Sequence, residues 1–382
     1  MPEIFLAAHD KELAVVVPFL ASLLFGLVIF PPYIKWLKSK QIEQHLREEG
    51  PKSHARKAKT PTMGGLGFIA AMIIGVAITG FYLKFVSVNS DVFKCLVIML
   101  ISVMCGVVGF ADDYGKVTSK SNKGVSAKKR LAVEFALGLL LAVCFLSLSQ
   151  EAGTVLVHPG GGTSGDAQFE FKMPWWLFCL SSSFMVAATT NAINLHDGMD
   201  GLAGGTSFLA FLTMAVMFTV LALPVESQLS AAAAGGLAAF LVFNRNPAKV
   251  FMGDTGSLFI GGLMAALVMS GGLILWFIPL SLIFIAETIS VMMQVSYFKL
   301  TKEFTPPKPM SPVMVAVHKL THKLPGEGKR IFRMAPLHHH FEAVLAEKNT
   351  GEASVVSMFW LAQFVLCAAI LSSFLAMHFP GK

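Results

Sequence analysis

The chain has 382 residues, of which 54% are hydrophobic and only 14% are charged, and its mean hydropathy is +0.66. Because soluble globular domains carry about 25% charged residues, this composition excludes an ordinary soluble protein and indicates an integral membrane protein. The formal net charge is +7. The basic residues flank apolar runs and form no continuous stripe, so we expect no nucleic-acid binding but attraction of anionic lipids and substrates.

Apolar stretches follow one another along the whole chain. A helix needs about 20 residues to cross the hydrocarbon core of a bilayer, and ten stretches approach or exceed that length. The sequence therefore predicts an all-α polytopic membrane protein, with one domain over residues 1–382 and about ten transmembrane helices. The ten stretches cover residues 13–37, 64–84, 92–111, 131–149, 175–195, 203–223, 229–243, 257–272, 275–300 and 355–377.

The distribution of Lys and Arg predicts the orientation. One set of alternate loops holds 25 of the 30 basic residues, and the other set, with both termini, holds five. Since cytoplasmic loops carry the excess of basic residues, we expect both termini to be periplasmic and the charged loops to be cytoplasmic. Residues 150–172 then form a small external hairpin without chemistry. The five cysteines lie inside apolar runs without CxxC spacing, which indicates neither a disulfide framework nor a zinc site.

The first predicted cytoplasmic loop ends in GPKSHARKAKTPTMGG, residues 50–65. It combines Lys57 and other basic residues with hydroxyl groups such as that of Thr62, and it closes on a glycine pair that opens the next helix. Free backbone amides and lysines at the start of a helix bind anions. A flank that only sets the orientation is the alternative for any single lysine.

Two adjacent carboxylates, Asp112 and Asp113, follow the third apolar stretch in the sequence GFADDYGK. An ionised carboxylate at a membrane boundary is costly unless a positive charge meets it, and we expect a divalent cation and a phosphate here. Neighbouring residues on a helix point about 100° apart. Either the helix ends at this point, or the two carboxylates have different roles.

Two more polar clusters adjoin later apolar runs. In NAINLHDGMDGLAGG, the side chains of Asn191, Asn194, Asp197 and Asp200 are spaced three apart and would form one oxygen-bearing ridge on a continued helix. No Lys or Arg is near them in the sequence, so we expect a cation or a ligand donor to meet this ridge. In FNRNPAKVFMGDTGSL, Asp254 stands between glycines that allow a close backbone approach to phosphate at a helix start. A simple helix cap is the alternative for Asp254.

The last predicted cytoplasmic segment runs from about residue 299 to residue 352. A proline-broken linker is followed by a basic amphipathic helix that we expect to lie on the membrane surface. The sequence HHHFE then begins at His338, for which phosphate contact or proton transfer is favoured over zinc binding. Glu287 and Gln294 are seven residues apart in the ninth stretch and so share a helix face. A glutamate inside a membrane span is a functional candidate.

These motifs, in this order, resemble those of the bacterial phospho-N-acetylmuramoyl-pentapeptide transferases, within the polyprenyl-phosphate sugar-1-phosphate transferase superfamily. The resemblance spans nearly the whole chain, and the HHHFE element is particular to this branch. It implies a ten-helix inner-membrane enzyme, usually a homodimer, with a cytoplasmic active site. It also implies transfer of phospho-MurNAc-pentapeptide from its UDP carrier to undecaprenyl phosphate, with Mg²⁺, giving lipid I and UMP.

The resemblance also implies roles at matching positions. The acidic core of Asp112, Asp113 and Asp254 would act in catalysis and at the metal, with Asp254 as a magnesium ligand and His338 as a further catalytic residue. Phe251 would stack on uracil. The remaining binding residues would be Asn194, Asp197, Asp200, Asn244 and Gly253 on the nucleotide side, with Lys57, Thr62, Gln294, His338 and His339 around the diphosphate and sugar.

The chain departs from the pattern of the family at three places. Lys59 stands where Gly is usual, His196 stands where Thr is usual, and residues 302–327 look like an insertion. Three alternatives remain open at this point: a covalent aspartyl-phosphate route, a sister transferase that uses a UDP-N-acetylhexosamine, and an ion-coupled transporter. The transporter would place its acidic residues near the membrane midplane.

Overall fold

In a computed structural model, the structure describes residues 2–40, 42, 60–82, 89–119, 124–148, 152–158, 169–306, 310–322, 324–347 and 351–379. Of the site residues expected from the sequence, Lys57 lies outside these ranges, as does the departure at Lys59. All the other expected site residues are described.

The described residues fold into thirteen helices and one antiparallel hairpin, whose strands β1 and β2 pair with an irregular register between Leu156 and His158. The hairpin expected within residues 150–172 is thus confirmed as a structure. The elements are α1 Pro2–Ser39, α2 Gly65–Tyr82, α3 Asn89–Ser119, α4 Ala127–Leu148, β1 Thr154–His158, β2 Phe169–Lys172, α5 Trp175–His196, α6 Leu202–Val220, α7 Pro224–Asn244, α8 Gly253–Ser270, α9 Ile274–Leu280, α10 Leu282–Leu300, α11 Pro312–Thr321, α12 Leu337–Ala346 and α13 Glu352–His378.

Within the described part of the chain, nine helices are long and apolar enough to cross a membrane, and α2 adds a shorter apolar helix over Gly65–Gly80. Each of the ten predicted stretches corresponds to one of these helices, which confirms an all-α polytopic membrane protein. The ninth stretch is not one helix. It is divided at Ser281 into the short α9, which contains Pro279, and the longer α10, because proline breaks the backbone hydrogen-bond ladder of a helix.

Several helices extend beyond the apolar stretches that predict them. Helix α7 begins at Pro224 instead of at residue 229, and its first turns include Glu226, which is fully buried. The Glu226 carboxylate accepts hydrogen bonds from Lys94 Nζ at 3.0 Å and from Ser270 Oγ. Since a polar group inside a membrane protein is tolerated when it is paired, the helix continues where hydropathy alone indicates an end.

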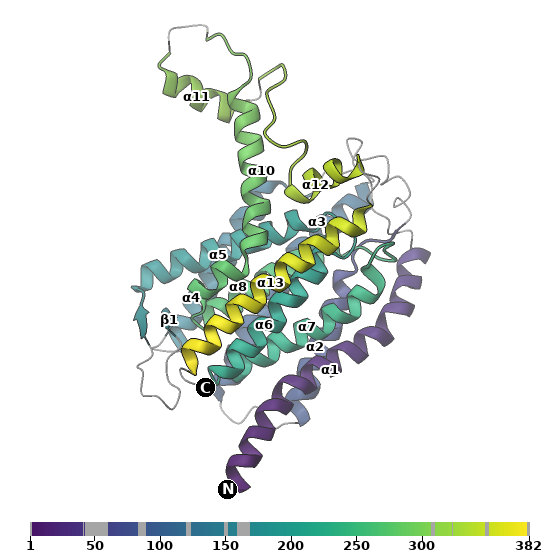
Figure 1. Cartoon of the computed structure of the whole chain (residues 1–382), viewed down its shortest axis with the longest axis vertical. Coiled ribbons are helices and arrows are strands. Elements are labelled where there is room, and N and C mark those ends of the chain that lie inside the picture. Colours follow the sequence, from purple (N-terminus) through teal and green to yellow (C-terminus); the bar gives the residue numbers. More distant parts are fainter. Residues whose placement is uncertain are drawn as a thin grey trace.

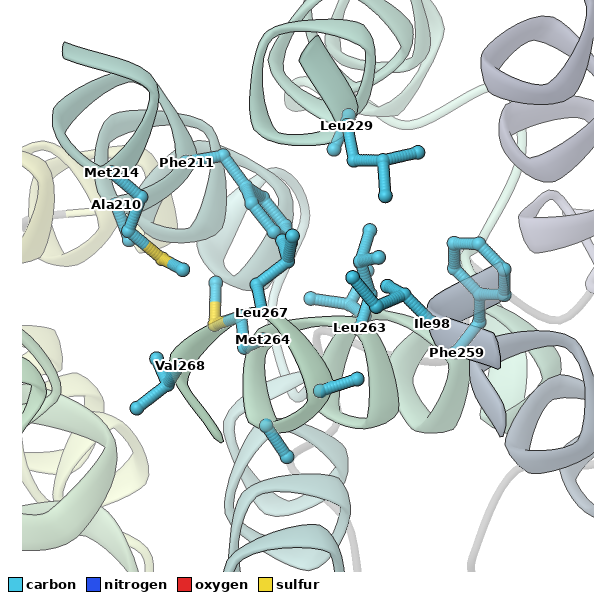
Figure 2. Close-up of a cluster of buried hydrophobic side chains, with 14 of the residues drawn as sticks. Ile98, Ala210, Phe211, Met214, Leu229, Phe259, Leu263, Met264, Leu267 and Val268 are labelled. Carbon is cyan, nitrogen blue, oxygen red and sulfur yellow. The ribbon is translucent and has the colours of Figure 1, made fainter. Parts of the chain in front are cut away.

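Helix α8 forms the centre of the bundle. Its side chains from Thr255 to Met269 are buried, and it packs extensively against α3 and α5. Figure 2 shows Phe259, Leu263 and Leu267 of this helix directed toward Ile98 of α3 and Phe211 of α6. This central position holds the start of α8, and with it Asp254, in a fixed place relative to the surrounding helices.

The outer surface of the bundle is apolar. Large hydrophobic side chains such as Val28, Leu96, Leu180 and Leu361 are more than half exposed, as expected where lipid replaces water as the surrounding solvent. In Figure 1, the N and C labels lie at one end of the bundle and α12 lies at the other, while α10 carries α11 away from the bundle.

Candidate active site

The two adjacent aspartates lie on a helix that does not end at them. Helix α3 continues to Ser119, so Asp112 and Asp113 point in different directions. Asp112 pairs with Lys116 Nζ at 2.5 Å through Oδ2, and its Oδ1 accepts a hydrogen bond from the backbone N–H of Val125. Both side chains are buried. Of the two alternatives that the sequence leaves open, an end of the helix at this point is therefore excluded, and the two carboxylates have different contacts.

Asp113 is bound to the start of α8. Its carboxylate accepts hydrogen bonds from the backbone N–H groups of Asp254 and Thr255, at 3.0 and 2.9 Å, and from the Thr255 hydroxyl at 2.7 Å. The first N–H groups of a helix have no acceptor within the helix, and here the Asp113 carboxylate of α3 is that acceptor. Asp113 therefore fixes the first turn of α8 against α3.

Asp254 directs its carboxylate away from its own helix. Oδ2 pairs with Lys116 Nζ at 2.8 Å and lies 3.9 Å from Arg130 Nη1, while Oδ1 accepts a hydrogen bond from Asn194 Nδ2 at 2.7 Å. Gly253, at φ = 75°, makes the turn, and a Cβ there would collide with Asp113. Asp254 is thus not a simple cap of α8, and it meets groups from α3, α4 and α5.

Two basic residues lie near these acids, Lys116 on α3 itself and Arg130 on α4. Lys116 lies between the carboxylates of Asp112 and Asp254, and Arg130 of α4 donates a hydrogen bond to Asn191 Oδ1 at 2.8 Å. The sequence indicated no cation near the α5 cluster, because Arg130 is some sixty positions away along the chain. The Asp112–Lys116 spacing of four residues is a helical ion-pair signal, and it could have identified Lys116 from the sequence.

The end of α5 divides the expected ridge. The helix ends at His196, so Asp200 does not continue the row formed by Asn191, Asn194 and Asp197. Burial, together with the nearby carboxylates of Asp254, Asp113 and Asp200, raises the pKa of Asp197 to about 8. The raised pKa means that Asp197 keeps its proton to higher pH than a free aspartate, and a cation beside these carboxylates would favour its ionised form.

Asp200 and Asn244 support the loop that leads to Asp254. Asp200 accepts hydrogen bonds from Asn246 Nδ2 at 3.2 Å and from the backbone N–H of Ala248 at 3.0 Å. Asn244 accepts one from the backbone N–H of Gly201 and donates one to the carbonyl of Val250, both at 2.9 Å. These contacts hold the loop on which Phe251 is presented.

The expected anion-binding loop lies against this same loop. The backbone N–H of Phe251 donates to the Pro61 carbonyl at 2.8 Å, and that of Gly64 donates to the Phe251 carbonyl at 2.7 Å. Thr62 is buried, and its hydroxyl lies near Gly253. The TPTMGG and NPAKVFMGD segments, far apart in the sequence, are therefore placed side by side at the start of α8.

The histidine segment, residues 338–340 of α12, packs against α10 and the end of α5. His338 Nδ1 is 3.2 Å from Glu287 Oε1, and a Cβ at Gly198 would collide with the His338 ring. Burial lowers the pKa of His338 to about 4, although Glu287 opposes the shift. Gln294 accepts hydrogen bonds from the backbone N–H groups of residues 331 and 332. Glu287 and Gln294 thus share the face of α10 that holds this segment, as their spacing predicts.

The expected residues therefore form groups that differ in their contacts. Asp112, Asp113, Asp254 and Asn194 meet directly, with Asp197 close to them. The His338 ring lies beside Gly198, the residue that follows Asp197. His339 Nδ1, by contrast, forms a hydrogen bond with Glu342 Oε2 at 3.0 Å. Gln294 lines a separate cavity of about 530 Å³ near α11.

The donor chemistry of the central group fits a hard divalent cation. Asp112 and Asp254 offer carboxylate oxygens, and the Asn194 side chain adds an amide oxygen to the same space. Oxygen donors of this kind suit Mg²⁺ or Ca²⁺ and not a soft metal. Lys116 now links the two carboxylates, which confirms that positive charge is stabilised at that position.

Comparisons with known proteins agree with this arrangement. A model of glycosyl transferase family 4 matches residues 95–272, which include Asp112, Asp113 and Asp254. The chain is 36% identical over 345 residues to the phospho-N-acetylmuramoyl-pentapeptide-transferase of Shouchella clausii, covering 89% of this chain and 91% of the relative. It is 37% identical over 363 residues to that of Heliobacterium modesticaldum, covering 94% and 97%. Identity at this level over nearly the full length of both proteins shows that the chain belongs to the phospho-N-acetylmuramoyl-pentapeptide-transferase family.

Proposed function

We propose that this protein transfers phospho-MurNAc-pentapeptide from UDP-MurNAc-pentapeptide to undecaprenyl phosphate, giving lipid I and UMP. The observation that carries the proposal is the meeting of Asp112, Asp254 and Asn194, from α3, α8 and α5, with two basic side chains among them. The names of the relatives identify the same transfer. The reaction is the first membrane step of peptidoglycan synthesis, which serves cell-wall biogenesis, cell shape and division.

Members of this family generally depend on a divalent metal, and we propose that Mg²⁺ is the metal here. Asp254, with Asp112, would hold the ion, because one oxygen of each carboxylate already meets the same cation, the Lys116 ammonium group. Asp113 would act at the site by fixing the first turn of α8 and so placing Asp254, since both of its oxygens already accept hydrogen bonds. When bound, Mg²⁺ supplies neutralisation of the phosphate oxygens.

The proposed reaction needs positioning more than it needs a base. An oxygen of the lipid phosphate attacks the phosphorus that bears the sugar, the bond from that phosphorus to the UMP oxygen breaks, and UMP leaves with the electron pair. The attacking oxygen is already anionic, so no strong base is required. Lys116 and Arg130 would counter charge at the transferring phosphate, and Asp112 would orient the lipid phosphate.

A covalent aspartyl-phosphate route is the alternative mechanism. Asp113 is poorly placed to be the nucleophile, because the N–H groups of α8 and the Thr255 hydroxyl occupy its carboxylate. Asp112 would then be the attacking group. Absence of a labelled phospho-sugar on protein stalled after UMP release, under conditions where UMP is measured, would argue against this route.

The substrates would lie on opposite sides of the acidic cluster. We propose that the Phe251 ring stacks on uracil, beside Asn244 and Gly253, and that Asn194, Asp197 and Asp200 line the nucleotide side. The diphosphate and sugar would contact Lys57, Thr62 and His339. Gln294, bonded to the backbone of residues 331 and 332, and His338, buried against Glu287, would position the histidine segment. The protein lies in the inner membrane as a multi-pass protein, and we propose that this site faces the cytoplasm, that both termini are periplasmic and that the chain forms a homodimer.

The proposal is tested with the purified full chain in lipid vesicles. We expect UMP release from UDP-MurNAc-pentapeptide only when both Mg²⁺ and undecaprenyl phosphate are present, with the lipid product formed in equal amount. UDP-GlcNAc serves as the comparison substrate. Equal turnover of UDP-GlcNAc would identify a sister transferase, and UMP release without lipid phosphate would contradict the transfer reaction.

A further inference from the structure

Three side chains that can bind a metal meet in the interior of the protein, apart from the aspartate cluster. They are His196 at the end of α5, Glu287 in α10 and His338 in α12, and all three are fully buried. One ligand atom from each lies within 4.8 Å of the others. The rings of Phe284 and Phe359, centred 5.1 and 5.8 Å from the His196 ring, give the group an apolar surrounding.

The hydrogen bonds of His196 define which of its nitrogens is free. The Thr206 hydroxyl has a single hydrogen, and it donates that hydrogen to the Leu202 carbonyl at 2.9 Å. Thr206 Oγ1 is therefore an acceptor for His196 Nε2–H at 3.1 Å. His196 Nδ1 then carries a lone pair, and it faces Glu287 Oε1 at 3.6 Å. Two lone pairs that face each other in a buried space repel, and a metal ion between them would relieve that repulsion, as a proton would.

The other two side chains also have unused ligand atoms. His338 Nε2 and Glu287 Oε2 are buried without a hydrogen-bond partner among the described residues, as is His196 Nδ1. Buried polar atoms without partners cost free energy, and each one in a folded protein calls for an explanation. A neutral imidazole is the form of histidine that binds metals.

We propose that His196, Glu287 and His338 bind a divalent transition-metal ion of the Zn²⁺ class, at a site separate from the proposed magnesium site. Two imidazoles and one carboxylate are a donor set that suits zinc, whereas Mg²⁺ prefers oxygen alone. Ligand atoms on a tetrahedral zinc, with bonds of about 2.0–2.1 Å, lie about 3.4 Å apart. The distances from Glu287 Oε1 to His196 Nδ1 and to His338 Nδ1 are 3.6 and 3.2 Å. A metal bound through these atoms would replace the present contact between His338 Nδ1 and Glu287 Oε1.

Such an ion would join three helices that are distant in the sequence. It would tie α12, which carries His338 and His339, to α10 and to the end of α5, where Asp197 follows His196 directly. We infer a structural role in holding the histidine segment next to the acidic cluster. This proposal does not rest on the transfer reaction, since the metal content of the protein can be measured without turnover.

The test measures zinc bound to the full chain, purified with a tag that contains no histidine, saturated with Zn²⁺ and then freed of excess metal. We expect one zinc per chain by elemental analysis, retained in Asp254→Asn and lost in His196→Thr. Half-buried His318 of α11 and exposed His322, the residue that follows this helix, have their rings centred 4.0 Å apart and are a competing place for zinc. The double variant His318→Gln, His322→Gln should therefore keep its zinc.

Two results would overturn the proposal directly. They are wild-type protein without bound zinc, and a folded His196→Thr variant with its full zinc content. X-ray absorption at the zinc edge of the wild-type protein provides a measurement that does not depend on a folded variant. We expect scattering from imidazole and carboxylate at first-shell distances, and a zinc with water oxygens alone would contradict the site. Loss of zinc in the α11 double variant would assign the metal to that helix.

Discussion

Asp112 and Asp113 have different surroundings although they are adjacent in the chain. Asp112 shares Lys116 with Asp254, whereas Asp113 has both oxygens occupied by the first turn of α8. The rotation of about 100° between successive helical residues produces this division. One carboxylate thus meets the cation shared with Asp254, and the other positions the helix that carries Asp254.

The role of Asp113 predicts a specific effect of its replacement. In Asp113→Asn, an amide N–H₂ would face N–H groups of α8, so at least one buried donor would lose its acceptor. We expect the free energy of unfolding to fall by about 1–3 kcal/mol, with a large loss of kcat because Asp254 moves. Thermal unfolding and steady-state kinetics of the purified variant measure the two effects.

Thr255→Val is the matched comparison for that variant. It removes only the hydroxyl hydrogen bond to Asp113 and leaves the two backbone bonds in place, so we expect a loss of about 0.5–1.5 kcal/mol and a smaller change in kcat. If Thr255→Val were as damaging as Asp113→Asn, the backbone contacts of Asp113 would not be what positions α8.

Sequence reasoning identified the acids but not their basic partners. The sequence alone identifies the three acids, Asp112, Asp113 and Asp254, because each of them adjoins an apolar run. The contact of Arg130 with Asn191, by contrast, depends on how α4 packs on α5. The sequence shows that His196 departs from the family pattern, but it does not show that His196 lies beside Glu287 and His338, because these residues meet only in the folded chain.

Helices α3 and α8 approach closely at a glycine near the acidic cluster. A Cβ at Gly109 would collide with the backbone of Asp254, whereas a Cβ at Gly115, on the same helix, would meet nothing within 4 Å. The absence of a side chain at position 109 therefore allows the carboxylates of the two helices to meet at hydrogen-bond distance.

We accordingly expect Gly109→Ala to separate α3 from α8. The free energy of unfolding should fall by about 1–3 kcal/mol, as for other overpacked sites, and turnover should fall strongly because Asp113 no longer reaches α8. Gly115→Ala is the control, with unchanged turnover and a gain of up to about 1 kcal/mol from helix propensity. Thermal unfolding measures the stability of each variant, and UMP release measures its turnover. Equal stability and equal turnover of the two variants would contradict this role of Gly109.

The segment expected as an insertion leaves α10 and returns to it. The backbone N–H of Lys329 donates to Thr301 Oγ1 at 2.7 Å, and Gly328 lies against the Phe298 carbonyl. Between these points, α11 exposes Val313 and Val317, and Lys319 donates to backbone carbonyls of residues 300 and 302. The described residues of the segment thus contact the end of α10.

This geometry predicts that the segment can be removed. Because its ends are adjacent, replacing residues 302–327 by a short Gly-Ser linker should leave the bundle intact and should keep UMP release within a few fold of the full chain. The measurement is turnover at saturating lipid phosphate and again at limiting lipid phosphate. Loss of folding, or loss of turnover at saturating lipid phosphate, would show instead that the segment belongs to the catalytic unit.

The order and number of membrane helices followed from the sequence because lipid exposure leaves a strong one-dimensional signal. Each apolar stretch became a helix, and only the edges moved where a polar residue such as Glu226 is paired inside the bundle or where proline divides α9 from α10. The lateral arrangement did not follow, since it depends on side-chain packing around α8 (Figure 2). The candidate site is a product of that arrangement.

The most direct test of the account compares Asp254→Asn with Asp91→Asn in UMP release from UDP-MurNAc-pentapeptide with lipid phosphate and Mg²⁺. Asp254 lies where α3, α4 and α5 meet α8, whereas Asp91 lies in the first turn of α3, outside the cluster. We predict that Asp254→Asn lowers turnover by orders of magnitude while the fold is kept, and that Asp91→Asn leaves it near the wild-type value. Near-normal turnover of Asp254→Asn would contradict the assignment of this cluster as the active site.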